Sequence, residues 1–380
     1  MLANGHWQPT RAGYDNPAFA SWHINALYSP LGLYSWKSVW EKWEVAKDDP
    51  SQMKAFINLE LGLPYQEQGT RPDDKVMLEH RGRYRQGELQ RGTLYLTAGV
   101  DVQAGKESWQ EGQNPDEGPR LEMEVLAHGR GYRTWSLCYR KFYGAVGDPY
   151  AGAWLALYEW CRTADPEIHK AEQTGFVRET DKWHFPIWAM FIDSGFNASV
   201  VYTFCSLAEV FMPCKGIGWV TEEKLKLKGD MPGPANTRHF RIAKVPGSEK
   251  EIFEVSTNYY KDQFYSRLHI LRAQTGDNPP GYCDFPMEYP PSHYEQLNSE
   301  TRWRDGSFHE ARTRREALDC RVYAMCAGEA FLMDQVSKRR EAIRRQGKEQ
   351  GASDAQTEAA MRQITPQSLL ELWDAQTWPK

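Results

Sequence analysis

Continuous apolar runs of strand length recur through the middle of the chain. Residues 93–102 (TLYLTAGVDV) and 186–193 (PIWAMFID) are apolar at successive positions, which is typical of strands buried on both faces. Residues 121–129 and 132–139 predict an antiparallel pair joined by a Gly-containing turn. We also expect helices at 150–163 and 197–207 and a short strand at 210–213. Strands interleaved with helices predict a mixed α/β sheet covered by helices on both faces.

The two ends of the chain show different patterns. Residues 1–90 predict loops and amphipathic helices followed by a polar linker, which places a domain boundary near Arg91. Thr313 and Glu316 have the spacing of a capping box ahead of an apolar run, which predicts a helix over 313–333. Beyond it we expect a charged, solvated helix at 335–350, a flexible polar stretch at 351–357 and a short helix at 366–378. The predicted parts are a mainly helical N-terminal extension (1–90), an α/β domain (91–333) and a partly flexible charged tail (334–380).

Composition narrows the class of protein. With 380 residues, 41% hydrophobic and 13% aromatic, the chain can bury a large core. A net charge of −5 excludes a uniformly basic nucleic-acid binder, so any DNA contact is expected from local patches. The seven cysteines form no C-x-x-C pair, which favours free thiols in a reducing cytosol and no structural zinc. No signal-like start and no long uncharged apolar stretch are present, so a secreted or membrane-spanning protein is not expected.

Three aspartates are candidates for one shared site. Asp101 follows the first continuous apolar run and Asp193 ends the second, so both are expected at carboxyl ends of buried strands, where ligands bind. Asp319 lies on the predicted 313–333 helix, on the apolar face that turns to the sheet. Three carboxylates at one point repel unless a cation neutralises them, and such oxygens suit Mg²⁺ or Mn²⁺. Two ions roughly 3.5 to 4 Å apart can then promote phosphodiester cleavage.

Each acid also has a purely structural interpretation. An aspartate at a strand end is more often a turn or cap former, and Asp193 before Ser-Gly fits that interpretation well. Asp319 could instead form a salt bridge with Arg315 or Arg321. From spacing alone, these alternatives stay open.

Two further charged positions are candidates beside the aspartates. Glu122 and Glu124 alternate with apolar residues, so both face one side of their strand, and one could be a fourth ligand or a general base. For Glu124, a solvent-facing position is at least as well supported. Lys215 follows the 210–213 strand and could contact the scissile phosphate, although a surface lysine in a turn fits equally well.

An ordered series of short motifs resembles a known family. The strings are AGVDVQ (98–103), FIDSG (191–195), PCKG (213–216), YKDQFYSRL (260–268), DFP (284–286) and RREALDCRVYA (314–324). In order and spacing they resemble the nuclease half of the large terminase subunit of lambda-type tailed phages. Upstream, WHINALYSP (22–30) and the helical region to Leu63 resemble the segment that closes that family's ATPase domain.

The resemblance implies a fold, a chemistry and partners. It implies a ribonuclease H-like domain that cuts concatemeric double-stranded phage DNA in the host cytoplasm with two Mg²⁺ or Mn²⁺ ions. It places Asp101, Asp193 and Asp319 in the family's acidic motifs as metal ligands, and Glu122 and Lys215 at further catalytic positions. The implied partners are DNA, an ATPase part or subunit, the small terminase subunit and the portal, with no membrane.

One departure from the family limits the expectation. A packaging motor needs a P-loop, G-x-x-x-x-G-K-[ST], and the sequence contains none, so no ATPase activity is expected from this chain alone. It could be one product of a split gene, a prophage relic or an excised piece. A rival interpretation is a non-catalytic assembly module that docks to the ATPase or portal. The N-terminal region contains five tryptophans: Trp7, Trp22, Trp36, Trp40 and Trp43. In the rival interpretation they form a docking face; the alternative is that they cover the nuclease core.

Basic residues near these motifs are candidates for DNA contact. Lys224, Lys226 and Lys228 lie in a segment, 216–245, that could form a hairpin on the duplex. Alternating lysines also protect edge strands from aggregation, so this alternative stays open. The arginines just before Asp319 form a second candidate cluster: Arg312, Arg314 and Arg315.

Overall fold

The computed structural model describes residues 25–30, 32–46, 50–63, 74–163, 175–177, 184–218, 239–245, 251–302, 308–310 and 314–377. By internal contacts the chain divides into two compact units, Met1–Gly69 and Thr70–Lys380. Each unit is therefore considered separately. Among the described residues, no helix is long and apolar enough to cross a membrane.

The first unit is a small helical assembly. It contains the short 3-10 helix η2 (Ala26–Tyr28) and the helices α1 (Trp36–Ala46) and α2 (Pro50–Leu59). Its core is formed by Val39, Ala46 and Phe56. Along α1, Trp36, Trp40 and Trp43 remain exposed on the surface of this unit. Trp7 and Trp22, which were predicted to share that face, lie outside the described residues.

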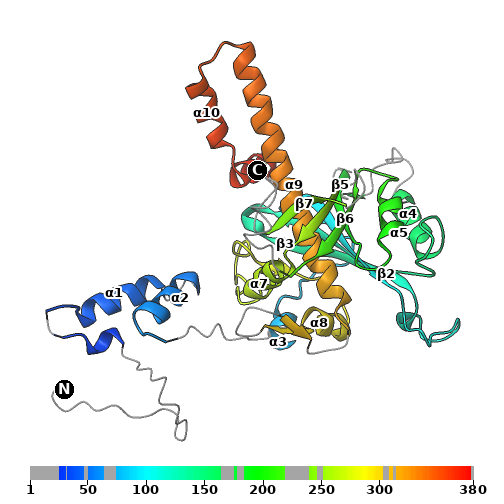
Figure 1. Cartoon of the computed structure of the whole chain (residues 1–380), viewed down its shortest axis with the longest axis horizontal. Helices are drawn as coiled ribbons and strands as arrows, with labels where there is room; N and C mark the ends of the chain where they lie inside the picture. The colour runs from blue at the N-terminus through cyan, green and yellow to red at the C-terminus, as the bar shows by residue number, and fades with distance from the viewer. Residues whose placement is uncertain are drawn as a thin grey trace, which may run out of the picture. The chain divides into compact units, whose positions relative to one another are not determined.

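The second unit is built on a mixed sheet, visible in Figure 1. Its strands are β1 (Thr93–Gln103), β2 (Arg120–Gly129), β3 (Thr134–Tyr143), β4 (Gly175–Val177), β5 (His184–Asp193), β6 (Phe211–Gly216), β7 (Phe240–Lys244), β8 (Glu251–Val255) and β9 (Cys283–Asp284). Their order is β7-β8-β6-β5-β1-β2-β3-β9, with β4 paired to β5. Strands β1, β2 and β3 form an antiparallel meander, whereas β1, β5, β6 and β8 run parallel to one another. This arrangement confirms the predicted ribonuclease H-like α/β fold.

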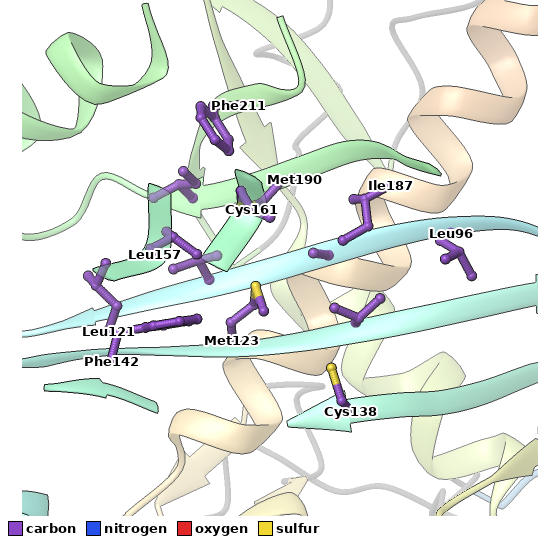
Figure 2. Packing of buried hydrophobic residues seen from close by; sticks show 14 of the residues in the cluster. Leu96, Leu121, Met123, Cys138, Phe142, Leu157, Cys161, Ile187, Met190 and Phe211 are labelled. Carbon is purple, nitrogen blue, oxygen red and sulfur yellow. The ribbon is translucent and has the colours of Figure 1, made fainter. Parts of the chain in front are cut away.

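Two helical layers cover the sheet. On one face, α4 (Gly152–Thr163) and α5 (Ala198–Cys205) pack on apolar residues of β1, β2 and β5. Figure 2 shows Leu157 and Cys161 of α4 above Leu121 and Met123 of β2, with Met190 of β5 beside them. On the other face lies the long helix α9 (Glu316–Glu349), with α3 (Asp74–Glu79), α7 (Thr257–Arg267) and α8 (Pro291–Leu297) around it. A separate two-stranded sheet is formed by β10 (Glu300–Arg302) and β11 (Phe308–Glu310).

The contact of α9 with β1 is made backbone against backbone. A Cβ atom at Gly99 would lie 2.1 Å from the Cys320 carbonyl oxygen and 2.5 Å from the Ala324 amide nitrogen. Two residues earlier on the same face of β1, Thr97 donates a hydrogen bond from its hydroxyl to the Ala324 carbonyl oxygen at 2.8 Å. Because side chains alternate along a strand, Asp101 lies on this α9 face as well.

The helix that carries Asp319 differs from its prediction at both ends. It begins at Glu316, and Arg315 precedes it without a side-chain cap, so the predicted capping box does not start the helix. Thr313 lies outside the described residues. The helix then continues to Glu349, and Leu332 and Val336 extend its buried face against β1 and α11.

The predicted charged tail belongs to the second unit, where its helices pack on α9 and β1. Figure 1 shows α10 (Asp354–Gln363) beside the distal half of α9. A capping box between Ser353 and Gln356 starts α10 within the stretch that was predicted to be flexible. The closing helix α11 (Pro366–Thr377) confirms its prediction, and it buries Leu369 and Leu370 against Leu94 of β1.

The second unit begins earlier than the boundary predicted near Arg91. His80 is buried, and its ring nitrogens lie 2.7 Å from the Cys283 carbonyl oxygen and 3.0 Å from that of Leu268. The Tyr84 hydroxyl donates to the Ser136 carbonyl oxygen at 2.9 Å. The polar composition of this segment suggested a linker, but its few apolar and aromatic side chains fill the edge of the core.

An ion pair is enclosed beneath α9. The Arg321 Nη2 atom lies 2.5 Å from Oε1 of Glu124, and both side chains are fully buried. The guanidinium also lies 4.9 Å above the centre of the Phe285 ring. The solvent-facing alternative for Glu124 is therefore wrong, because α9 covers this face of β2.

We expect Gly99→Ala to destabilise the second unit by about 2 to 3 kcal/mol, because the new methyl group has no space against the α9 backbone. The matched control is Gly147→Ala, since a Cβ atom at Gly147 would meet no atom within 4 Å. Urea unfolding followed by near-UV circular dichroism measures both. Equal midpoints for the two variants would contradict the close contact.

We expect Arg321→Met to cost about 3 to 5 kcal/mol, because it leaves the Glu124 carboxylate buried without its cation. The double variant Arg321→Met/Glu124→Gln removes both charges and should unfold at higher urea concentration than the single variant. A single variant that is as stable as the parent protein would show that the pair is not buried in solution.

Candidate functional site

Neighbouring strands bring two of the predicted aspartates to one edge of the sheet. Asp101 is 5% exposed near the end of β1. Since β1 and β5 run parallel with Val100 opposite Ile192, Asp193 follows at the same edge. Glu122 lies directly opposite Asp101 on the antiparallel strand β2. The strand order therefore places these acids together.

The third aspartate comes from the first turn of α9. Asp319 precedes Cys320, whose carbonyl oxygen is in the close contact with Gly99 two residues before Asp101. The charges of Asp101 and Asp319 interact, and each also interacts with that of Asp193. The three carboxylates are thus near enough for their charges to interact, and their role as one site stays a prediction.

Burial and mutual repulsion make the charged forms of these acids unfavourable. Burial raises the pKa of Asp101 well above its usual range, and the charge of Asp319 raises it further. Burial also raises the pKa of Asp319 to about 6, while the ammonium group of Lys261 opposes the shift. For Asp193, burial raises the pKa and the backbone N–H of Gly195 opposes it. A bound cation would relieve this repulsion.

Protein groups contact each carboxylate in the present arrangement. Gln103 donates to Asp101 at 2.5 Å, and the Gly195 amide donates to Asp193 at 3.2 Å. Around Asp319, Arg315 Nε lies at 3.5 Å and Lys261 Nζ at 3.8 Å. In the part of the chain that the structure describes, no three His, Cys, Asp or Glu side chains form a ready metal site. The donor chemistry fits a hard divalent cation, but binding one requires these carboxylates to turn toward it.

The structural alternatives for these acids are partly present as well. Asp193 accepts the turn hydrogen bond from Gly195 that its Ser-Gly context suggested. Asp319 pairs with Arg315, whereas Arg321 pairs with Glu124 instead. These contacts coexist with the convergence of the three acids.

Glu122 is fully buried on the strand beside Asp101 and is surrounded by donors. Arg120 Nε lies 2.5 Å from its Oε1 atom, Arg314 Nη2 lies at 3.2 Å, and the Tyr139 hydroxyl donates to Oε2. Arg120 also bridges to Glu316 at the start of α9 at 2.7 Å. Glu122 therefore ties β2 to the helix that carries Asp319.

Lys215 is exposed at the end of β6. Its strand pairs with β5 so that Cys214 lies opposite Asp193. The ammonium group of Lys215 opposes the burial-induced rise in the pKa of Asp193. The structure thus provides an exposed cation beside the acids.

The predicted DNA-contact residues fall into two groups. Lys224, Lys226, Lys228 and Arg312 lie outside the described residues. Arg314 contacts Asp116 at 3.4 Å as well as Glu122, and Arg315 pairs with Asp319. Both arginines balance acids around the site, and their contact with DNA stays a prediction.

Three residues at the site were not predicted from the sequence. Lys261 is 7% exposed on α7 and lies 2.7 Å from the carboxylate of the buried Glu300. Tyr323 lies in the α9 turn after Asp319, and its hydroxyl opposes the burial-induced rise in the pKa of Asp193. Lys261 belongs to the 260–268 motif, and Tyr323 shares the predicted face of Asp319, so both had a signal in the sequence. Glu300 had none, because only the fold brings it to α7.

Comparisons with known proteins identify the family of this chain. Residues 19–340 match the family described as terminase large subunit gpA, endonuclease domain. The chain is 26% identical over 325 residues to the large terminase subunit of Escherichia phage lambda, covering 82% of this chain and 44% of that protein. The large terminase subunit of Enterobacteria phage P21 is 25% identical over 326 residues, with the same coverage.

The chain spans less than half the length of these two relatives. No solved structure matches it. The family match extends over most of the chain and includes all three aspartates. This chain therefore belongs to the family of the terminase large subunit gpA endonuclease domain.

Proposed function

We propose that this chain is a metal-dependent endonuclease that cuts double-stranded DNA during phage DNA packaging. The observation that supports it is the convergence of Asp101, Asp193 and Asp319 at one sheet edge, where burial and repulsion disfavour their charged forms. A cluster of this kind is stabilised by divalent cations. Two Mg²⁺ or Mn²⁺ ions, when bound, supply activation of the attacking water and stabilisation of the leaving oxygen.

The chain's own residues would divide the remaining tasks. The three aspartates supply the ligand oxygens, and the Gly195 amide orients the Asp193 carboxylate through its hydrogen bond. Lys215 is exposed beside Asp193, where its ammonium group can bind a phosphate of the DNA backbone. Glu122 is fully buried on the strand beside Asp101, and this burial favours a positioning role over direct contact with substrate.

The assembly around this activity is also a proposal. Both relatives are named as large terminase subunits, and this chain corresponds to less than half of each. The sequence lacks a P-loop, so we propose that the ATPase acts from a separate part or chain. The small terminase subunit and the portal would complete the machinery in the host cytoplasm.

We expect the purified chain to nick or linearise plasmid DNA with Mg²⁺ or Mn²⁺, and EDTA to stop the reaction. Asp193→Asn should lower the cleavage rate by roughly 10²- to 10³-fold, the range for loss of one electrostatic group at an active site. The amide oxygen of the substituted side chain can still accept the Gly195 hydrogen bond, so the fold should persist. Agarose-gel time courses measure the rates.

The matched control for that experiment is Asp334→Asn. Asp334 is an exposed acid on the distal half of α9, where it forms an ion pair with Lys338 at 2.7 Å. Its variant should cleave at the parental rate. Intact plasmid across a range of metal and protein concentrations would favour the non-catalytic assembly module instead.

We expect Asp101→Asn to raise the melting temperature of the metal-free protein, because it removes one of three repelling buried charges. The same variant should lose the stabilisation by Mn²⁺, which in the parent protein is about 2.7 kcal/mol at one hundred times the dissociation constant. Thermal unfolding with and without Mn²⁺ measures both effects. An equal Mn²⁺-induced shift in the variant would remove Asp101 from the metal site.

A further inference from the structure

A second site lies at the opposite end of β1 from the acids. It is a cavity of about 210 Å³, bounded by β1, the β2–β3 turn, α7 and α9. Tyr95 of β1 lines it, six residues before Asp101, which corresponds to roughly 20 Å along a strand. The cavity is far larger than the volume of a single water molecule. It is therefore separate from the candidate nuclease site and has space for a small molecule.

Polar groups with unused bonding capacity line this cavity. Within the described part of the chain, the guanidinium of Arg267 and the amide of Gln263 have no hydrogen-bond or ion-pair partner. The two residues are one turn apart on α7, so both project to the same side of that helix. Arginine is suited to bind planar or tetrahedral oxyanions such as carboxylates and phosphates. An unpaired guanidinium inside a cavity thus indicates an anionic ligand.

Aromatic residues line the same cavity as Arg267. Tyr95, Tyr132, Tyr259 and Tyr260 line the cavity from three different elements. Tyr132 has a φ angle of 59°, in the left-handed region that favours glycine. A tyrosine in this conformation is costly for the fold, and such residues cluster at ligand-binding positions. Tyr132 is half-exposed and is one of the residues that line the cavity.

The remaining wall carries a fixed hydrogen-bond acceptor. Glu329 of α9 accepts a hydrogen bond from the Tyr260 hydroxyl at 2.9 Å, and its other oxygen lies 2.7 Å from Nδ1 of His239. His239 in turn stacks on Tyr259 with 3.7 Å between ring centres. These contacts hold the carboxylate in place while leaving lone pairs for a further donor. A ligand here needs an anionic group, a flat body and N–H donors.

We propose that this cavity binds a nucleotide, with the phosphate at Arg267, the base against the tyrosine rings and the N–H groups of the base toward Glu329. Guanine fits best, because its N1 and N2 atoms offer adjacent donors that match a carboxylate. The nucleotide is either free or the phosphorylated end of a DNA strand. The proposal does not depend on nuclease activity.

The test is equilibrium binding of dGMP to the full chain in EDTA, measured by isothermal titration calorimetry, so that metal at the acidic site plays no part. We expect saturable binding of dGMP, at least tenfold weaker binding of TMP, and at least tenfold weaker binding of dGMP to Arg267→Gln. Tyr132→Gly should also weaken dGMP binding tenfold or more. Because glycine tolerates the left-handed backbone, this variant should keep the fold.

The charge control is Arg339→Gln on the exposed distal half of α9, which should bind dGMP like the parent protein. Competition by a 5′-phosphorylated oligonucleotide that begins with dG identifies a strand end as the ligand, whereas its failure to compete identifies the free nucleotide. No binding of dGMP at millimolar concentration would overturn the proposal. Equal affinity for inorganic phosphate and dGMP would overturn it too, since the cavity would then recognise only an anion.

Discussion

The direct contact between the backbones of α9 and β1 is the constraint on which the rest of the second unit depends. At Gly99 there is no room for even one methyl group, so the helix lies as near the strand as two backbones allow. This approach sets the position of Asp319 relative to Asp101, because each lies within two residues of the contact. A glycine in a central strand weakens that strand locally, and the benefit here is a helix in contact with the sheet.

Negative charge gathered at one place requires compensation throughout its surroundings. Lys261 and Arg315 lie beside Asp319, while Arg120 and Arg314 hold the buried Glu122. These cations explain how the acids are tolerated before any metal arrives. They also explain why several arginines near the site are engaged with carboxylates and not displayed as an open basic surface. The overall charge of −5 is thus compatible with a local site for an anionic substrate.

The helix α9 connects two chemically different ends of the sheet. Its first turn carries Asp319 at the acidic site, and a later turn carries Glu329 at the cavity lined by Arg267. Farther along, its buried face continues against α11. One continuous helix therefore fixes both sites relative to the same strand, β1. A change in how α9 lies on β1 would therefore move residues at both sites.

The sequence by itself determined strands β1, β2, β3, β5 and β6, the mixed α/β class and the closing helix, and it singled out three candidate aspartates, because apolar periodicity and strand-end carboxylates are local properties. It could not determine where the second unit begins, since the segment with His80 and Tyr84 is polar in composition yet packs on residues some two hundred positions away. Only the tertiary structure assigned Arg321 to Glu124, brought Lys261 and Glu300 to Asp319, and enclosed Glu122. Partners of charged side chains depend on which elements meet in space, and that information is not contained in local spacing.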